Sequence, residues 1–216
     1  MTLGAHFIDE RQLRERIAEA GRRAVGLGST GAPERQRAYE DWLFPHHDDA
    51  AHKASMADGM YSCGLNARSC LRASGVDAPE LSAPYSKNIG SIFAWLTNVA
   101  KRMGAFVDLS SPAKVDAAPW LDVGDVVIVS GPDHVIVLTD DMGDETFRTS
   151  EGGRPEAGPN GERGMCIHSR IVKPEVRSDG RIWIAGLDDR TGQPTKGRRA
   201  EWAINARWLQ TREGES

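Results

Sequence analysis

The sequence contains little cysteine and lacks both long apolar runs and an excess of charge of one sign. Cys63, Cys70 and Cys166 are the three cysteines of the 216 residues; they are too few and odd in number for a disulfide framework and offer no Cys-x-x-Cys spacing for a zinc site. No apolar run approaches the roughly 18 residues of a membrane-spanning helix. The net charge of −4 gives no field that would hold nucleic acid. We expect free thiols, no membrane span and no nucleic-acid partner.

The first residues do not read as a secretory signal, because Asp9 and Glu10 follow soon after Met1 without a basic patch and apolar stretch. We therefore expect cytoplasmic synthesis, with any export by a non-classical route or release by lysis. The length corresponds to about one and a half average domains. We expect one elaborated domain, in which a helical extension at 1–50 packs on a catalytic domain at 51–216.

The spacing of apolar residues changes along the chain from helical to strand-like. It predicts helices at 7–25, 33–43, 61–74, 88–104 and 201–209. It predicts strands at 123–130, 134–139, 146–150, 165–172 and 181–184, and loops at 152–164 and 188–199. Helices first and strands later favour an α+β fold with helices packed on an antiparallel sheet.

Cys63 is the predicted nucleophile, because it stands at the start of the helix expected at 61–74. The unpaired N–H groups and the dipole at a helix start favour the negative charge of a thiolate. Gly64 follows and is expected to leave room for a substrate backbone. Cys70 lies two turns further along the same face, where a buried, unreactive thiol is expected.

His134 is the predicted base, because it opens an apolar strand where a lone imidazole is unusual. Glu151, at the end of the next strand, is the predicted third residue that fixes the ring. Asp140 and Asp141 are its competitors for this role. The backbone N–H of Cys63 and the side chain of Tyr61 are candidate oxyanion donors.

These motifs resemble the papain-like peptidoglycan amidohydrolases of the NlpC/P60 and CHAP group. The resemblance rests on Cys63-Gly64-Leu65, on the strand Gly124-Asp125-Val126-Val127 that leads to His134-Val135, and on Ser150-Glu151-Gly152-Gly153. It covers about residues 55–155, and Gly153 stands where that group commonly has asparagine. It implies a papain-like fold and a Cys63, His134 and Glu151 triad that needs no cofactor or metal.

Four other signals are weaker. Gly26 to Gly31 satisfies GxGxxG but follows a helix, whereas a dinucleotide site needs a preceding strand. His46, His47, Asp48, Asp49 and His52 are metal-capable but have no recognised ligand spacing. Cys166 and His168 form an alternative pair on one strand face. Lys196, Arg198 and Arg199 form a short basic cluster that is expected to be solvated or to touch an anionic cell-wall polymer.

The sequence therefore predicts a cysteine amidohydrolase or endopeptidase that cleaves amide bonds of peptidoglycan, as a cell-wall lytic enzyme or an exported antibacterial toxin. The expected partners are peptidoglycan or a peptide substrate, with an immunity protein or a secretion or phage structural component as further possibilities. One alternative is a thiol protease, deamidase or acyltransferase that acts on a protein. The other is a catalytically inactive binding module of a phage or secretion particle.

Overall fold

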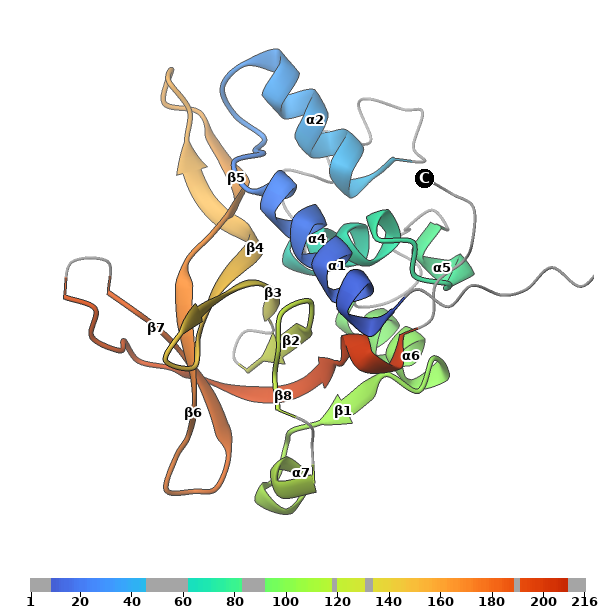
Figure 1. Ribbon diagram of the computed structural model, residues 1–216. Helices are drawn as coiled ribbons and strands as arrows, with labels where there is room; N and C mark the ends of the chain where they lie inside the picture. Colours follow the sequence, from blue (N-terminus) through green and yellow to red (C-terminus); the bar gives the residue numbers. More distant parts are fainter. Residues whose placement is uncertain are drawn as a thin grey trace, which may run out of the picture.

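The protein folds into a barrel of antiparallel strands with helices packed on it (Figure 1). The computed structural model describes residues 9–45, 62–82, 92–117, 120–130, 134–188 and 191–209. The helices are α1 (Glu10–Ala24), α2 (Pro33–Leu43), α4 (Ser62–Ala73), α5 (Pro79–Ser82), α6 (Ile92–Arg102), α7 (Pro112–Ala117) and the 3-10 helix η2 (Ala206–Trp208). The strands are β1 (Phe106–Asp108), β2 (Val126–Val129), β3 (His134–Gly143), β4 (Thr146–Ala157), β5 (Arg163–His168), β6 (Ile171–Val176), β7 (Ile182–Gly186) and β8 (Arg198–Ile204).

Six of these strands close into a ring. Neighbours pair antiparallel in the order β2, β3, β4, β6, β7 and β8, and β8 returns to pair with β2. The other two described strands, β1 and β5, are added at β8 and β4. The expected papain-like α+β fold, with helices packed on an open antiparallel sheet, is therefore wrong. Closure depends on β8, which the sequence analysis assigned to a loop and a helix.

Strand β2 is buried on both faces because its side chains alternate between two apolar cores. Val127 and Val129 of β2 belong to a core to which all six barrel strands contribute, and this core fills the barrel interior. Val126 and Ile128 point to the other face, where they pack with apolar side chains of α1, α2, α4 and α6. The helices thus cover one outer side of the barrel, as Figure 1 shows.

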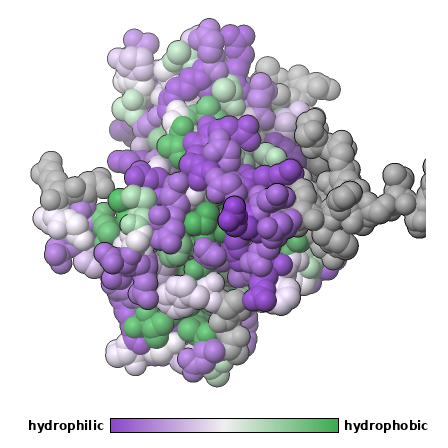
Figure 2. Space-filling view, viewed as in Figure 1, coloured by the Kyte–Doolittle hydropathy of each residue, from purple (hydrophilic) through white to green (hydrophobic). Residues whose placement is uncertain are grey.

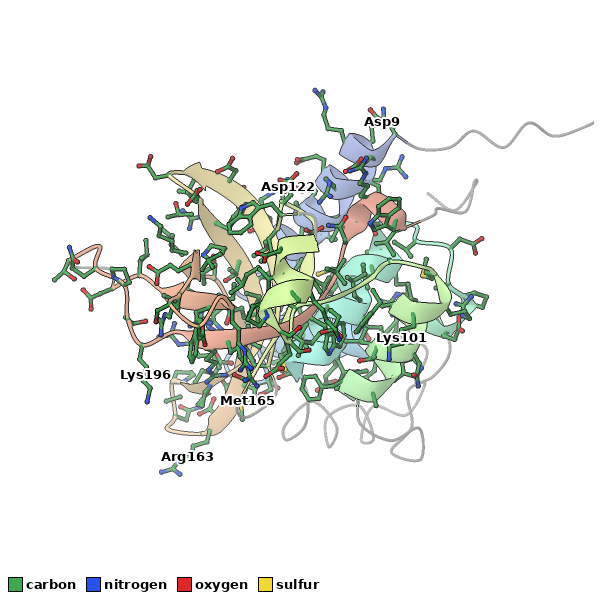
Figure 3. All side chains as sticks on the ribbon, turned by 90° about the horizontal axis from the view of Figure 1, so that it is seen from below. Asp9, Lys101, Asp122, Arg163, Met165 and Lys196 are labelled. Carbon is green, nitrogen blue, oxygen red and sulfur yellow. The ribbon has the colours of Figure 1, made fainter. Side chains whose placement is uncertain are left out.

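A buried polar network fixes α1 to the barrel. Arg14 donates to the Asp125 carboxylate at 2.8 Å, to the Val123 carbonyl at 3.0 Å and to the Asn205 amide oxygen at 3.2 Å. Asp125 is fully buried. Figure 3 labels Asp122, whose carboxylate also lies 3.8 Å from Arg14. The Gly-Asp part of the sequence motif therefore has a structural use here, because it receives the guanidinium of α1.

The predicted helices agree better with the structure than the predicted strands. The helices expected at 7–25, 33–43, 61–74 and 88–104 are found as α1, α2, α4 and α6 over their described parts. The strand expected at 165–172 is divided between β5 and β6, and much of the loop expected at 152–164 is strand. Among the described residues, no helix has the length and apolar character needed to cross a bilayer. The surface seen in Figure 2 is largely hydrophilic.

Candidate active site

Cys63 is the second residue of α4, at the end of this helix that approaches β4. Gly152 of β4 makes this approach possible. A Cβ atom built on Gly152 would lie 2.3 Å from the carbonyl oxygen of Ser62 and 2.8 Å from the backbone nitrogen of Cys63. A larger residue would therefore push the helix start away from the strand. The glycine after Glu151 sets the distance between the thiol and the barrel.

His134 and Glu151 form a short hydrogen bond across the two neighbouring strands β3 and β4. The ring Nε2 lies 2.8 Å from Glu151 Oε2, and the His134 and Glu151 side chains are 18% and 1% exposed. Cys63 is the other group whose attraction raises the pKa of the imidazole. Because Nε2 faces Glu151, Nδ1 is the ring nitrogen available to the sulfur. The three residues predicted from the sequence are thus brought together in the order thiol, imidazole and carboxylate.

The competing carboxylates lie elsewhere along β3. Asp140 pairs with Arg22 of α1 at 3.1 Å. Asp141 accepts a hydrogen bond from the backbone N–H of Gly143 at 2.8 Å. Both stand near the end of β3, whereas His134 stands at its start. Glu151 is therefore the carboxylate that hydrogen-bonds the ring.

The electrostatic surroundings of His134 favour the protonated imidazole, because Cys63 and Glu151 both attract its positive charge. Burial disfavours the charge on His134, but the hydrogen bonds and electrostatic attraction of Cys63 and Glu151 outweigh it and raise the pKa of the ring to about 9. Burial also disfavours the charge on Glu151, yet the His134 hydrogen bond and the Arg170 guanidinium lower its pKa to about 2. At neutral pH the carboxylate is therefore ionised and the ring carries a proton, which stabilises a nearby thiolate.

The site lies at one open end of the barrel. His134 lies on the same face of β3 as Ile136, and Glu151 lies on the same face of β4 as Phe147. Ile136 and Phe147 both belong to the interior core. A cleft of about 340 Å³ adjoins His134 and Glu151 at this end. Its other side chains are basic, from Arg154, His168, Arg170 and Arg198. The imidazole and the carboxylate of the site thus face a cleft that also carries three arginines, whereas Cys63 is not among its lining residues.

Arg170 and Thr149 complete the environment of Glu151, and the sequence analysis did not single them out. Arg170 Nε donates to Glu151 Oε1 at 2.7 Å, and the Thr149 hydroxyl donates to the same oxygen at 2.6 Å. His168 lies 3.9 Å from Glu151 Oε2. A threonine two residues before the carboxylate shares its strand face, so alternation alone signals Thr149. Arg170 gives no local signal, because its contact requires β4 and β6 to be neighbours.

The remaining predicted features have other surroundings. Cys70 is fully buried, and burial raises the pKa of its thiol to about 12. Burial and the charge of Glu156 raise the pKa of Cys166, so this thiol resists ionisation. Gly64 does not leave room for substrate, because a Cβ there would lie 2.7 Å from the Ile92 side chain of α6. The lack of a side chain at Gly64 lets α4 and α6 pack closely instead.

The glycine segment and the basic cluster are placed as follows. The GxGxxG segment begins directly after α1, and Gly26 has a φ of 94°, as is typical of a residue that ends a helix. Of the basic cluster, Arg198 lines the cleft, whereas Arg199 pairs with Glu201 at 2.5 Å.

Some predictions fall outside the described residues. Tyr61 and the group His46, His47, Asp48, Asp49 and His52 are among them. Within the described parts of the chain, no group of three or more histidine, cysteine or acidic side chains has a metal-binding arrangement. No family model, curated protein or solved structure matches this chain. Functional inference therefore rests on the geometry and on the sequence motifs.

Proposed function

We propose that this protein is a cysteine hydrolase that cleaves an amide bond of peptidoglycan. The observation that carries the proposal is the contiguous arrangement of Cys63 at a helix start, His134 with a raised pKa, and the buried Glu151. A thiol, a base and an orienting carboxylate are the groups that acyl transfer through a covalent intermediate requires. The choice of peptidoglycan rests on the resemblance to the NlpC/P60 and CHAP group.

The proposed reaction has two steps. The Cys63 thiolate attacks the amide carbonyl, and the protonated His134 gives its proton to the amine as the C–N bond breaks. A thioester remains on Cys63. Water then loses a proton to His134 and attacks the thioester, which releases the acid and restores the Cys63 thiolate beside the protonated ring. Glu151 keeps the ring oriented and stabilises its positive charge through both steps.

The experiment is digestion of purified bacterial cell wall, with the released fragments identified by mass spectrometry. The wild type and Cys70→Ala should release the same fragments, whereas Cys63→Ala and His134→Ala should release none. Cys70→Ala is the matched control, because it removes a buried thiol from the same helix. A thiol alkylator should abolish the wild-type signal. Chelators should not change it, because no step of the proposed mechanism uses a metal.

The same variants separate the alternatives. Intact cell wall of several chemotypes, together with cleavage or deamidation of a protein that depends on Cys63, would favour action on a protein substrate. Inertness toward both substrates would favour the inactive binding module if Cys63 also reacts with alkylators no faster than an ordinary thiol.

A further inference from the structure

The cleft beside the proposed catalytic residues carries more positive charge than its own carboxylate can balance. Glu151 is the single acidic residue among the described residues that line it, against the three guanidinium groups of Arg154, Arg170 and Arg198. Glu151 also has both oxygens engaged, one by His134 and one by Arg170 and Thr149. Neither Arg154 nor Arg198 is among the groups that hydrogen-bond this carboxylate.

Neighbouring carboxylates do not supply the missing partners. Glu156, close to Arg154 in sequence, pairs with Arg35 of α2 at 2.7 Å. Glu201, on the same strand as Arg198, pairs with Arg199. In the part of the chain that the structure describes, neither Arg154 nor Arg198 forms an ion pair. Two arginines of separate strands thus meet at one cleft, and neither pairs with a carboxylate of the described residues.

The position of the cleft connects this charge to the proposed reaction. His134 and Glu151 line the same cleft, so a ligand bound there lies beside the proposed base and its orienting carboxylate, although Cys63 itself does not line the cleft. Its volume of about 340 Å³ is at the lower end for small-molecule sites, which suits one residue of a substrate better than a long polymer segment. Arginine forks bind carboxylate and phosphate groups in a bidentate manner.

We propose that Arg154 and Arg198 bind a carboxylate of the substrate residue next to the scissile amide. This inference rests on the proposed function, because it assigns the cleft to the same reaction. Arg170 adds positive charge but also holds Glu151 in place. The preferred substrate is thus a peptide with a free carboxylate close to the cleaved bond, and an amidated peptide is a poor one.

The first test compares a stem peptide of peptidoglycan with free carboxylates and the same peptide with those groups amidated. Wild-type kcat/KM should be about 10- to 100-fold higher for the free acid, in line with the strength of hydrogen bonds to charged groups. Arg154→Gln and Arg198→Gln should lose most of this preference, chiefly through KM. Arg163→Gln is the matched control, because Arg163 lies on the same hairpin but outside the cleft (Figure 3).

The second test measures binding without turnover. Calorimetry with Cys63→Ala protein should show tighter binding of the free-acid peptide than of its amidated form, and inorganic phosphate is the competing probe. Equal binding of both peptides would overturn the proposal. Saturable phosphate binding that the free-acid peptide does not displace would also overturn it and assign the cleft to phosphate.

The two tests separate this inference from the proposed function. Cleavage that ignores amidation keeps the hydrolase and rejects the carboxylate site. Binding of the free acid that depends on Arg198, with no cleavage of any cell wall, keeps the site and rejects the hydrolase. The peptide comparison in wild-type protein needs no variant, so a variant that fails to fold does not prevent a decision.

Discussion

Replacing Glu151 by glutamine should lower the pKa of His134 by a measurable amount. The rise of this pKa from 6.5 to about 9 corresponds to about 3 kcal/mol of stabilisation of the charged ring. This is a net value, since burial acts in the opposite direction. Two partners, Cys63 and Glu151, produce it. Because burial opposes them, their combined effect exceeds this net value, and the loss of either partner therefore lowers the pKa of the ring.

The assay is an NMR titration of the imidazole C–H signals, with His134→Gln used to assign the His134 resonance among the six histidines. The wild-type ring should titrate near 9, and the pKa of His134 should be clearly lower in both Glu151→Gln and Cys63→Ala. The double variant should titrate at or below 6.5, because burial then acts without compensation. Glutamine retains the shape of the side chain and an oxygen acceptor, so the comparison isolates the charge.

Glu156→Gln is the matched control, because Glu156 lies on the same strand but pairs with Arg35. It should leave the His134 titration unchanged. A wild-type pKa for His134 in Glu151→Gln would refute the electrostatic coupling between the two residues. The cell-wall assay should then show near-normal turnover for this variant. If coupling is present, turnover should fall substantially, but less than in Cys63→Ala or His134→Ala.

Four further predictions concern stability and geometry. In the folded protein Glu151 has a pKa of about 2, below its ordinary 4.5. Its contribution to the free energy of unfolding is therefore present above pH 4.5 and is lost as the pH falls toward 2. Melting curves of Glu151→Gln should lack this loss of stability at acid pH. The contribution of His134 to stability is present below pH 6.5 and is lost as the pH rises through about 9. Melting curves of His134→Gln should lack this pH-dependent loss. Arg14→Met should reduce the free energy of unfolding, measured by urea titration, by about 3–5 kcal/mol, because it leaves Asp125 buried and unpaired. The control Arg16→Met changes an exposed residue of the same helix and should alter this free energy by no more than about 0.5 kcal/mol. Gly152→Ala should reduce kcat by about 100-fold through displacement of Cys63, and unchanged kinetics in a folded variant would show that β4 does not set the position of the thiol.

Four of the helices, and the proximity of Cys63 and His134, could be predicted because their signals are local. The apolar spacing of α1 and the cysteine at the start of α4 can be read within one or two turns. His134 stands out because it is polar at the start of an apolar strand. Glu151 was predicted as one of three candidate carboxylates. The sequence alone does not exclude the other two, because the choice depends on which strand lies beside β3.

Barrel closure could not be predicted because it depends on a segment with mixed signals. β8 contains Ala200, Ala203 and Ile204 as buried residues, a short pattern that fits a helix as well as a strand, and alanine favours the helix. Gly152, Gly153 and Pro155 similarly indicate a loop, although they lie in β4, whose register shifts between Glu151 and Arg154. Tertiary pairing overrides local preference in both places.

The late position of β8 has a consequence for biosynthesis. Cys63, His134 and Glu151 all precede it in the chain, so they are made before the strand that pairs with both β2 and β7. Until β8 is added, these two strands have open edges, which promote association with other chains. An unfinished chain therefore contains the complete triad sequence but neither the closed barrel nor Arg198. Premature termination should therefore yield aggregated or degraded fragments.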